Sequence, residues 1–294
     1  MSKLSDAVKA LINAPAASPG LTKASAQVKP ALARFASSAA EKKVGLPAWI
    51  TMSTAVSATL NCPEAMTSIF HVANEQSSGG GGGSSRTPAQ NAELIREVGL
   101  KCISFNGIPR SINTLGAFYG SLPTDVAAQL SQTARPTRQL TPQNLEARQR
   151  DGLALWDSVY VGFERKLLDK LGQSHPDLPV HILNGHYSNL LSNPRGEARP
   201  AGGTVGRVLT SLVAISCLRT QTGVGPQVVS HIFGLRKAYE FGDARAEGEE
   251  EVQGGEWLAS DEGNLWMLEQ IDGLANVITG GSGTTFAPGL RAKL

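Results

Sequence analysis

Residues 87–118 read TPAQNAELIREVGLKCISFNGIPRSINTLGAF, and this stretch predicts a helix that breaks and then resumes. Thr87 supplies an N-cap hydroxyl, Pro88 suits the first helical position, and Gln90 completes a capping box. An apolar face at helical spacing follows, formed by Leu94, Ile95, Val98 and Cys102. The Asn-Gly-Ile-Pro sequence at 106–109 should interrupt the helix, which then resumes through Ser111, Ile112, Leu115 and Phe118.

Residues 204–235 show the same plan. A strongly amphipathic helix over 204–221 is predicted by the stripe Val205, Val208, Leu209, Leu212, Val213 and Ser216. The Gly-Val-Gly-Pro sequence at 223–226 breaks it, and a second helix continues through Val228, Val229, Ile232 and Leu235. When Pro109 is laid on Pro226, the offset is 226 − 109 = 117 residues. The two stretches therefore indicate two related helix–corner–helix units.

Strand signals are scarce, and further helices are predicted elsewhere. One should open at Thr141-Pro142 and run to about Leu171, with these residues inward: Leu153, Trp156, Val159, Tyr160, Phe163 and Leu167. A last helix should run from Trp257 to about Ile278, with these residues inward: Leu258, Leu265, Leu268, Ile271 and Leu274. We predict an all-α fold, a bundle of roughly ten helices.

The domain organisation follows from these elements. We predict an N-terminal helical extension over 1–45 and one domain over 46–278, whose two internal units cover about 46–140 and 141–278. The segments 77–86, 193–204 and 243–256 are rich in Gly, Pro, Ser or Glu and are expected to be surface insertions, the last of them acidic and solvated. The glycines at 79–83 are not a phosphate loop, because neither a preceding strand nor a Gly-Lys-Ser/Thr sequence accompanies them.

Composition excludes several function classes. The chain has 294 residues, of which 41% are hydrophobic and 18% charged, with a net charge of +2. These values are ordinary for a globular protein and give no electrostatic reason to expect nucleic acid as a partner. No apolar run is long enough to span a bilayer, so we expect no membrane partner. The three cysteines, Cys62, Cys102 and Cys217, are widely spaced and are expected to be buried apolar residues.

The chain ends in Ala292, Lys293 and Leu294, a close variant of the Ser-Lys-Leu tripeptide that the peroxisomal import receptor binds. Residues 279–294 contain several Gly residues and one Pro, which is typical of a mobile tail that can present the tripeptide. We therefore expect the peroxisomal matrix as the location and the import receptor as a partner. The alternative is a frayed basic terminus that carries this tripeptide by chance.

Two quoted stretches resemble a known family. Glu97 followed by VGLKCISFNGIPRSINTLGAF, together with RVLTSLVAISCLRTQTGVGPQVVSHIFGLRKAYEFG, is similar to the carboxymuconolactone decarboxylase-like branch of the alkyl hydroperoxidase D fold. The similarity covers about residues 50–280, and with the terminal tripeptide it is greatest for fungal peroxisomal matrix members. The resemblance implies an all-α fold with duplicated units, a homo-oligomer of two or more subunits, and a small pocket at the helix corners for a small-molecule ligand.

The resemblance implies either of two activities, peroxide reduction or decarboxylation. Peroxide-reducing members carry an acidic residue, then Cys-x-x-Cys, then a histidine. The positions of those cysteines fall near Pro109 and Ile112, and this chain has no cysteine pair at that spacing. Peroxide reduction would therefore need an unusual route, with Cys102 and Cys217 meeting only by tertiary proximity.

The decarboxylase reaction asks for other residues. Loss of CO2 from an unsaturated acid leaves a dienolate, which needs an oxyanion donor and a proton donor. Arg110 would bind a substrate carboxylate, His231 would protonate or polarise the substrate, and Glu97 would act as base or set a histidine tautomer. Asn113 and the backbone of the corner at Gly107 and Pro109 would orient the ligand.

Three plainer alternatives stay open for these residues: the corner is a tight turn, His231 belongs to the core, and Glu97 pairs with an arginine. We expect no metal, because His181 and His186 lie five apart, about 140° round an α-helix. No cofactor is expected, because Gly223-x-Gly225 lacks the rest of a dinucleotide motif. A non-catalytic module that binds a partner or ligand is the third function left open.

Overall fold

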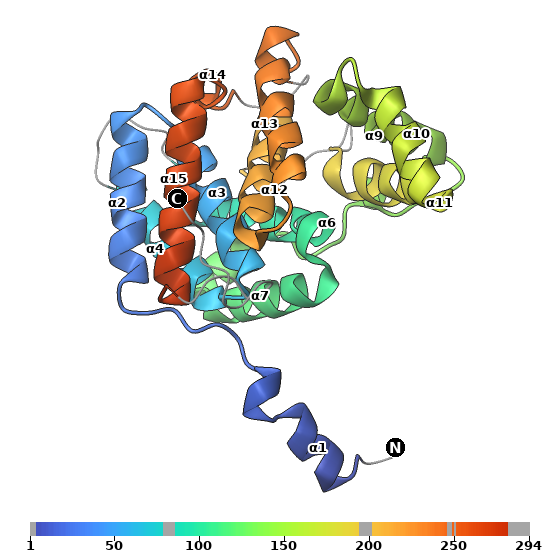
Figure 1. Ribbon diagram of the computed structural model, residues 1–294. Helices are drawn as coiled ribbons and strands as arrows, with labels where there is room; N and C mark the ends of the chain where they lie inside the picture. The colour runs from blue at the N-terminus through green and yellow to red at the C-terminus, as the bar shows by residue number, and fades with distance from the viewer. Residues whose placement is uncertain (1–3, 79–85, 194–201, 246–248, 250, 282–294) are drawn as a thin grey trace.

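Helices form all the regular structure in the computed structural model, which describes residues 4–78, 86–193, 202–245, 249 and 251–281 (Figure 1). No strand occurs among them, so the predicted all-α fold is confirmed. Elements η1 and η2 are short 3-10 helices, and η3 is a π-helix. In chain order the elements are α1 Asp6–Ile12, η1 Pro15–Ala17, α2 Val28–Glu41, α3 Leu46–Thr59, α4 Pro63–Ser78, α5 Pro88–Lys101, α6 Ile103–Asn106, α7 Ile108–Ser121, α8 Thr124–Gln129, η2 Pro136–Arg138, α9 Leu145–Tyr160, α10 Glu164–Ser174, α11 Asp177–His181, η3 Ile182–Leu191, α12 Arg207–Gln221, α13 Gly225–Glu240, α14 Gly255–Leu258 and α15 Asp261–Thr279.

Helix α3 lies at the centre of the main body. Every residue from Ala48 to Thr59 is buried, because α12, α4, α5 and α15 pack around it. A helix enclosed on all sides has no polar face, and so its sequence shows no amphipathic period. The apolar stripe predicted for 204–221 is buried, but the other faces of α12 are buried as well, so the predicted amphipathic character is wrong. Helix α12 packs directly against α3.

The first 45 residues divide into two parts. Helix α2 packs against α4 and α15, and its residues Val28, Leu32 and Phe35 belong to the main core. Helix α1 buries none of its residues and projects away from the body (Figure 1). Of the predicted N-terminal extension, α1 stands apart from the core, whereas Ala24, before α2, already packs against it.

Helices α9, α10, α11 and η3 form a lobe at the side of the body (Figure 1). Its own small core contains Trp156, Tyr187 and Leu191. The prediction of one helix from 141 to about 171 is wrong. Residues 142–144 form a turn before α9, and α9 ends at Tyr160 because Gly162 adopts a left-handed φ of 83° before α10 begins.

Two residues predicted to be inward in this region are exposed. Leu153 on α9 is 45% exposed, and Phe163, which lies in the turn after α9, is 61% exposed. The last predicted helix is likewise two helices, α14 and α15. Ser260 separates them, since its hydroxyl caps α15 by accepting from the N–H of Gly263. Leu265, expected inward there, is 62% exposed.

Both predicted corners are present. Helix α5 opens with the Thr87–Gln90 capping box, and the chain turns into α7 at Gly107, whose φ is 77°. Helix α12 ends at Gln221, and α13 follows two residues of positive φ, Thr222 and Gly223. The corners touch, because the Gln221 side-chain amide donates to the side-chain oxygen of Asn106 at 3.1 Å.

Several predicted segments fall outside the described residues: 79–85, 194–201, 246–248, 250 and the tail 282–294 with Ala292, Lys293 and Leu294. Within the acidic insertion, Glu249 is buried, whereas a solvated residue was expected. Its carboxylate accepts from the side-chain nitrogen of Asn193 at 2.8 Å and from the backbone N–H of Arg207 at 3.1 Å. No helix in the described part of the chain is both long and apolar enough to cross a membrane.

Candidate functional site

The predicted site residues do not meet in one cavity. Glu97 lies on α5, Arg110 and Asn113 lie on the first turns of α7, and His231 lies on α13. Each makes a separate set of contacts, and of the four residues His231 is the one that borders either of the two hollows described below. The candidate site is therefore centred on His231, and the other predicted residues have contacts elsewhere in the fold.

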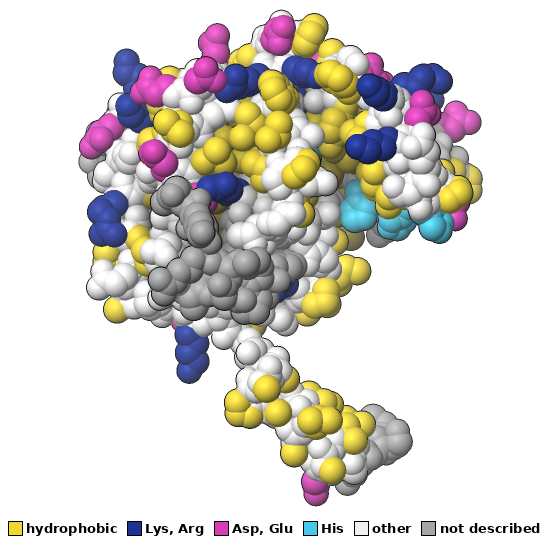
Figure 2. Space-filling model, in the orientation of Figure 1, with side chains coloured by type: hydrophobic (Ala, Val, Ile, Leu, Met, Phe, Trp, Pro, Cys, Tyr) yellow, Lys and Arg dark blue, Asp and Glu magenta, His cyan; other side chains and the backbone are white. Residues whose placement is uncertain are grey.

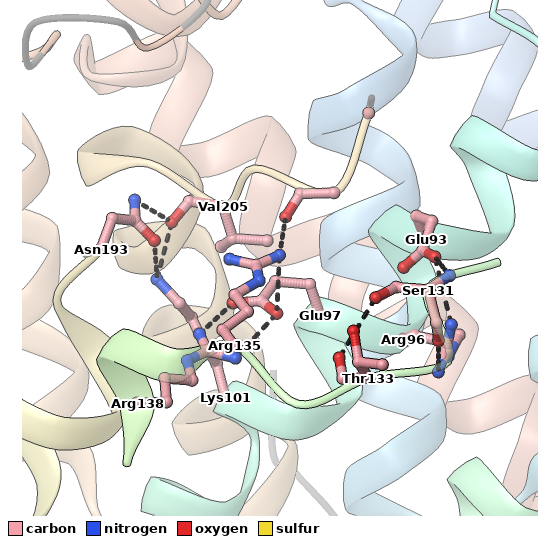
Figure 3. Close-up of polar contacts among 12 residues, drawn as sticks. Glu93, Arg96, Glu97, Lys101, Ser131, Thr133, Arg135, Arg138, Asn193 and Val205 are labelled. Carbon is pink, nitrogen blue, oxygen red and sulfur yellow. Dashed lines mark hydrogen bonds and ion pairs between the residues drawn. The ribbon is translucent and has the colours of Figure 1, made fainter. Parts of the chain in front are cut away.

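Glu97 is held in an internal ion pair (Figure 3). Arg138 donates to both carboxylate oxygens, one of them at 3.1 Å, and Arg135 approaches to 3.7 Å. Burial opposes ionisation of Glu97, but the hydrogen bonds and charge of Arg138, aided by the charges of Lys101 and Arg135, keep its pKa below the usual value. The alternative that Glu97 pairs with an arginine is what the structure shows.

Lys101 lies one helical turn after Glu97 and is fully buried, a feature that the sequence analysis missed. Its ammonium nitrogen donates to the carbonyl oxygens of Leu191 and Val205, each at 2.6 Å. Figure 3 shows the contact with Val205. It also contacts the hydroxyl of Thr210 at 3.0 Å. Lys101 thus ties the end of η3 and the chain before α12 to α5. The i, i+4 spacing of Glu97 and Lys101 was the available signal.

Arg110 and Asn113, which follow the corner, form hydrogen bonds with residues at the end of α3. Arg110 donates to the carbonyl oxygen of Thr59 at 2.5 Å, and Asn113 donates to the side-chain oxygen of Asn61 at 3.2 Å. Burial lowers the pKa of the Arg110 guanidinium. Gly107 and Pro109 are exposed, and neither borders the hollows described below. The corner therefore anchors α7 rather than enclosing a ligand.

His231 faces a pocket between the lobe and the body. In this conformation the pocket has room for about one water-sized molecule. The walls come from α6, α9, η3, α12 and α13 and consist of these residues: Phe105, Leu155, Val159, Tyr187, Leu191, Thr210, Ser211, Ala214 and His231. Most of this lining is apolar, and the polar groups are the imidazole and a few hydroxyls. Such a lining suits a small ligand with a limited number of polar atoms.

The imidazole of His231 lies between two rings, with Phe105 and Tyr160 each at 6.0 Å between centroids. Within the described residues no side chain or backbone group hydrogen-bonds to it. Burial, helped by the nearby positive charge of Arg207, lowers the pKa of His231 to about 4. The ring is therefore neutral at physiological pH and has one nitrogen able to accept a proton or a hydrogen bond.

Arg207, which the sequence analysis also missed, is the buried cation beside this pocket. Its guanidinium donates to the hydroxyls of Ser158 at 2.7 Å and Ser211 at 2.6 Å, and to the carbonyl oxygen of Gly234 at 2.8 Å. Burial lowers its pKa to about 10, so it stays charged. Arg207 is thus a fixed positive charge whose hydrogen bonds join α9, α12 and α13. A charged residue at the first turn of a strongly apolar helix was the signal for it.

A second hollow, of about 410 Å³, lies beside Arg86, Arg207 and Glu249. None of the residues predicted for catalysis or substrate binding borders it. Glu249 and Arg207 are joined there by the hydrogen bond from the Arg207 backbone N–H. The hollow therefore gives no position for the predicted chemistry.

The three cysteines are buried, as predicted. Burial raises the pKa of the Cys62 thiol to about 11. Cys102 and Cys217 come together although 115 residues separate them, with their Sγ atoms 3.6 Å apart. The neighbouring Cys217 thiol and burial raise the pKa of Cys102 well above its usual value. The structure thus supplies the tertiary proximity that spacing alone could not establish.

His181 and His186 also lie together, and the prediction that they point apart is wrong. Their ring centroids are 5.3 Å apart, because the chain from 182 to 191 is a π-helix, in which residues five apart are one turn apart. The histidine side chains of the lobe gather at its lower edge in Figure 2. Even so, no group of three or more His, Cys, Asp or Glu side chains in the described ranges could hold a metal ion.

Comparison with known proteins gives no relative. No family model, no curated protein and no solved structure matches this chain. The functional argument is therefore carried by the residues and contacts described above.

Proposed function

We propose that the His231 pocket, widened by movement of its walls, binds a small organic acid or lactone and that His231 is its acid–base residue. One observation carries this proposal: a buried, neutral imidazole without a hydrogen-bond partner in the described structure faces a pocket. A ligand with one polar atom at the imidazole would supply the ring with a hydrogen bond that no described side chain or backbone group provides.

The charge beside the pocket favours an acidic ligand. Arg207 is a buried cation that lowers the pKa of His231. A carboxylate bound in the pocket would offset the positive charge and raise the pKa of the imidazole, so that binding is coupled to proton uptake. The imidazolium formed in this way can deliver its proton to a carbanion left by loss of CO2. These steps make up the decarboxylase-like reaction that the family resemblance implies.

The other residues of the predicted decarboxylase set receive different roles in this proposal. The Glu97 carboxylate is paired with Arg138, and Arg110 is hydrogen-bonded to Thr59. Neither borders the His231 pocket. We assign both to the stability of the fold, and Asn113 with them. Substrate binding is assigned to the pocket walls and no longer to the corner at Gly107 and Pro109.

Purified protein tested against a panel of carboxylated lactones and unsaturated acids should bind at least one of them with uptake of a proton. Titration calorimetry in buffers of different ionisation enthalpy measures that uptake. His231→Gln should weaken binding and any CO2 release by about tenfold or more, whereas His181→Gln on the lobe surface should leave both unchanged. Equal behaviour of the two variants would overturn the proposal.

Peroxide reduction is a second candidate, favoured by the approach of Cys102 and Cys217. Both sulfurs are fully buried, and neither borders a described hollow. A peroxidase that turns over rapidly needs an accessible thiolate. We therefore rank it below the His231 pocket. Peroxide turnover that survives the replacement of all three cysteines by alanine would exclude it.

We propose further that Ala292, Lys293 and Leu294, at a free carboxyl terminus, direct the chain to the peroxisomal matrix by binding the import receptor. A fluorescent protein fused ahead of the full chain should then appear in peroxisomes. Deletion of Leu294 should make the signal diffuse, and Arg291→Ala should not. A signal that stays in peroxisomes without Leu294 would contradict the proposal.

We also propose that the chain forms homo-oligomers. Apolar residues are exposed along α1 and just before it, and Val8, Leu11 and Ile12 are 44%, 76% and 53% exposed (Figure 2). A second unpartnered apolar face lies on α7, where Ile108 and Ile112 are exposed. Such faces are commonly covered in an assembly. Light scattering should give a mass above one chain for the natural protein and a smaller mass for Leu11→Glu.

A further inference from the structure

Two thiols from distant parts of the chain meet in the centre of the body. Cys102 ends α5, and Cys217 lies near the end of α12. Their Sγ atoms are 3.6 Å apart, and both residues have no exposed surface. A disulfide requires about 2.05 Å between sulfurs. The sulfurs therefore need to close by about 1.5 Å to form the bond.

The surroundings of the two sulfurs are different. The side-chain nitrogen of Asn106 donates toward the Sγ of Cys217 at 3.6 Å. The amide of Asn106 cannot turn freely, because its oxygen accepts from Thr59 at 3.2 Å and from Gln221 at 3.1 Å. A donor held against one sulfur stabilises negative charge on it during attack. Cys217 is thus the sulfur prepared for attack, and Cys102 is the sulfur positioned to follow.

The corner of the first unit covers the pair. Helix α6, Ile103–Asn106, is one turn long and lies between Cys102 and the left-handed Gly107. Asn106 is 9% exposed. Opening of one turn costs less free energy than unfolding of the packed helices. The proposal below requires that this turn opens transiently so that a small oxidant reaches the sulfurs.

We propose that Cys102 and Cys217 are a redox pair that hydrogen peroxide converts into a disulfide. The Cys217 sulfur attacks one peroxide oxygen, the O–O bond breaks, and the departing oxygen takes the thiol proton and leaves as water. The Cys102 sulfur then attacks the sulfenic sulfur of Cys217. The S–O bond breaks, and the oxygen leaves as a second water with the Cys102 proton. Two thiols are oxidised and one peroxide is reduced to two waters.

This pair is independent of the His231 pocket, because it neither borders the pocket nor shares a hydrogen bond with its polar groups. The disulfide would join α5 to α12 and hence fasten the first helix–corner–helix unit to the second. A dithiol reductant reverses it by exchange. The chain would then have two covalent states, distinguished by one bond in its core.

The experiment uses the full chain, treated with hydrogen peroxide under native conditions, denatured in an alkylating agent and cut with trypsin. Cleavage after Lys101, Arg110, Arg207 and Arg219 releases the two cysteines in peptides 102–110 and 208–219. We expect these peptides joined by a disulfide, and separated again when dithiothreitol precedes alkylation. Cys62, in peptide 44–86, is the internal control and should remain an alkylated thiol.

Two variants sharpen the test. Asn106→Leu should slow formation of the bond by about tenfold, and Cys62→Ser should leave its rate unchanged. The proposal is overturned if both peptides remain alkylated after treatment of protein that circular dichroism shows to be folded. It is overturned equally if Cys62 reacts as fast as Cys217, since oxidation would then follow exposure on unfolding.

Discussion

Arg138 donates hydrogen bonds to both carboxylate oxygens of Glu97, although the two residues are 41 apart in the chain. Both side chains are largely buried. The pair joins η2 to α5, so it fixes the long connection between α8 and α9 on the body. Arg135 adds a second positive charge at 3.7 Å. Glu97, which was predicted to act as a base or to set a histidine tautomer, therefore holds two segments of the fold together.

Glu97→Gln should lower the free energy of unfolding by about 3–5 kcal/mol, because the buried guanidinium of Arg138 loses its counter-charge. The matched control is Glu75→Gln, which removes the exposed pair between Lys29 and Glu75. Exposed pairs contribute at most about 1 kcal/mol. Urea unfolding of both variants measures the difference, and equal stabilities would contradict a structural role for Glu97.

The pKa of His231 predicts a pH dependence of stability. The folded value is about 4 and the ordinary value is 6.5, so between these pH values the unfolded chain binds more protons than the folded one. Its contribution is constant above about pH 6.5 and falls as the pH drops toward 4. Between pH 7 and pH 4.5 the loss should be about 2–3 kcal/mol.

His231→Gln should remove that part of the dependence. His71→Gln is the control, because His71 is exposed on α4. Urea unfolding of the natural protein and of both variants at pH 7 and pH 4.5 measures how much each one loses in stability between the two pH values. If the stability of His231→Gln falls as steeply as that of the natural protein, the buried imidazole is not the group responsible.

Lys101→Met should be strongly destabilising. The substitution keeps the buried chain of methylenes but removes the Lys101 donor from the carbonyl oxygen of Leu191, and it leaves the carbonyl oxygen of Val205 with only Asn193 and Thr210 as donors. We expect a loss of about 3–5 kcal/mol and faster amide hydrogen exchange over residues 187–193. Lys29→Met on the surface of α2, which removes only the exposed pair with Glu75, should change stability by at most about 1 kcal/mol. Unchanged exchange over 187–193 would mean that Lys101 does not secure the end of η3.

Two glycines should respond to alanine in opposite directions. A Cβ at Gly152 on α9 would lie 2.5 Å from the backbone nitrogen and Cα of Ser188 on η3, so the two helices would have to separate. Gly152→Ala should cost about 1–3 kcal/mol. Gly116 on α7 has no atom within 4 Å of its Cβ position, and Gly116→Ala should stabilise by about 0.5–1 kcal/mol. Thermal unfolding distinguishes the two, and a stable Gly152→Ala would show that α9 and η3 can be moved apart at little cost.

Local features of the fold followed from local sequence. The capping box at Thr87 and the stripe on α12 were predicted because each depends on residues within a few turns of one another. The break at Gly162 was missed, since the apolar spacing continues across it and only the backbone conformation of that residue ends α9. Helix α3 gave no period at all, because it is enclosed by other helices on every side.

The site was less predictable than the fold for the same reason. Periodicity shows which face of a helix is buried, but it does not show which distant residue lies against that face. The partners of Glu97 and Cys102 are 41 and 115 residues away. The relation between His181 and His186 depended on helix type, because a five-residue separation closes one turn only in a π-helix.

The walls of the His231 pocket come from both the lobe and the body. Leu155, Val159 and Tyr187 belong to the lobe, whereas Ala214 and His231 belong to the body. A molecule that fills the pocket touches both sides at once, so its affinity and the attachment of the lobe are thermodynamically linked. Ligand binding should make the lobe harder to detach. A substitution that loosens the lobe without touching the ligand should weaken binding by the same factor.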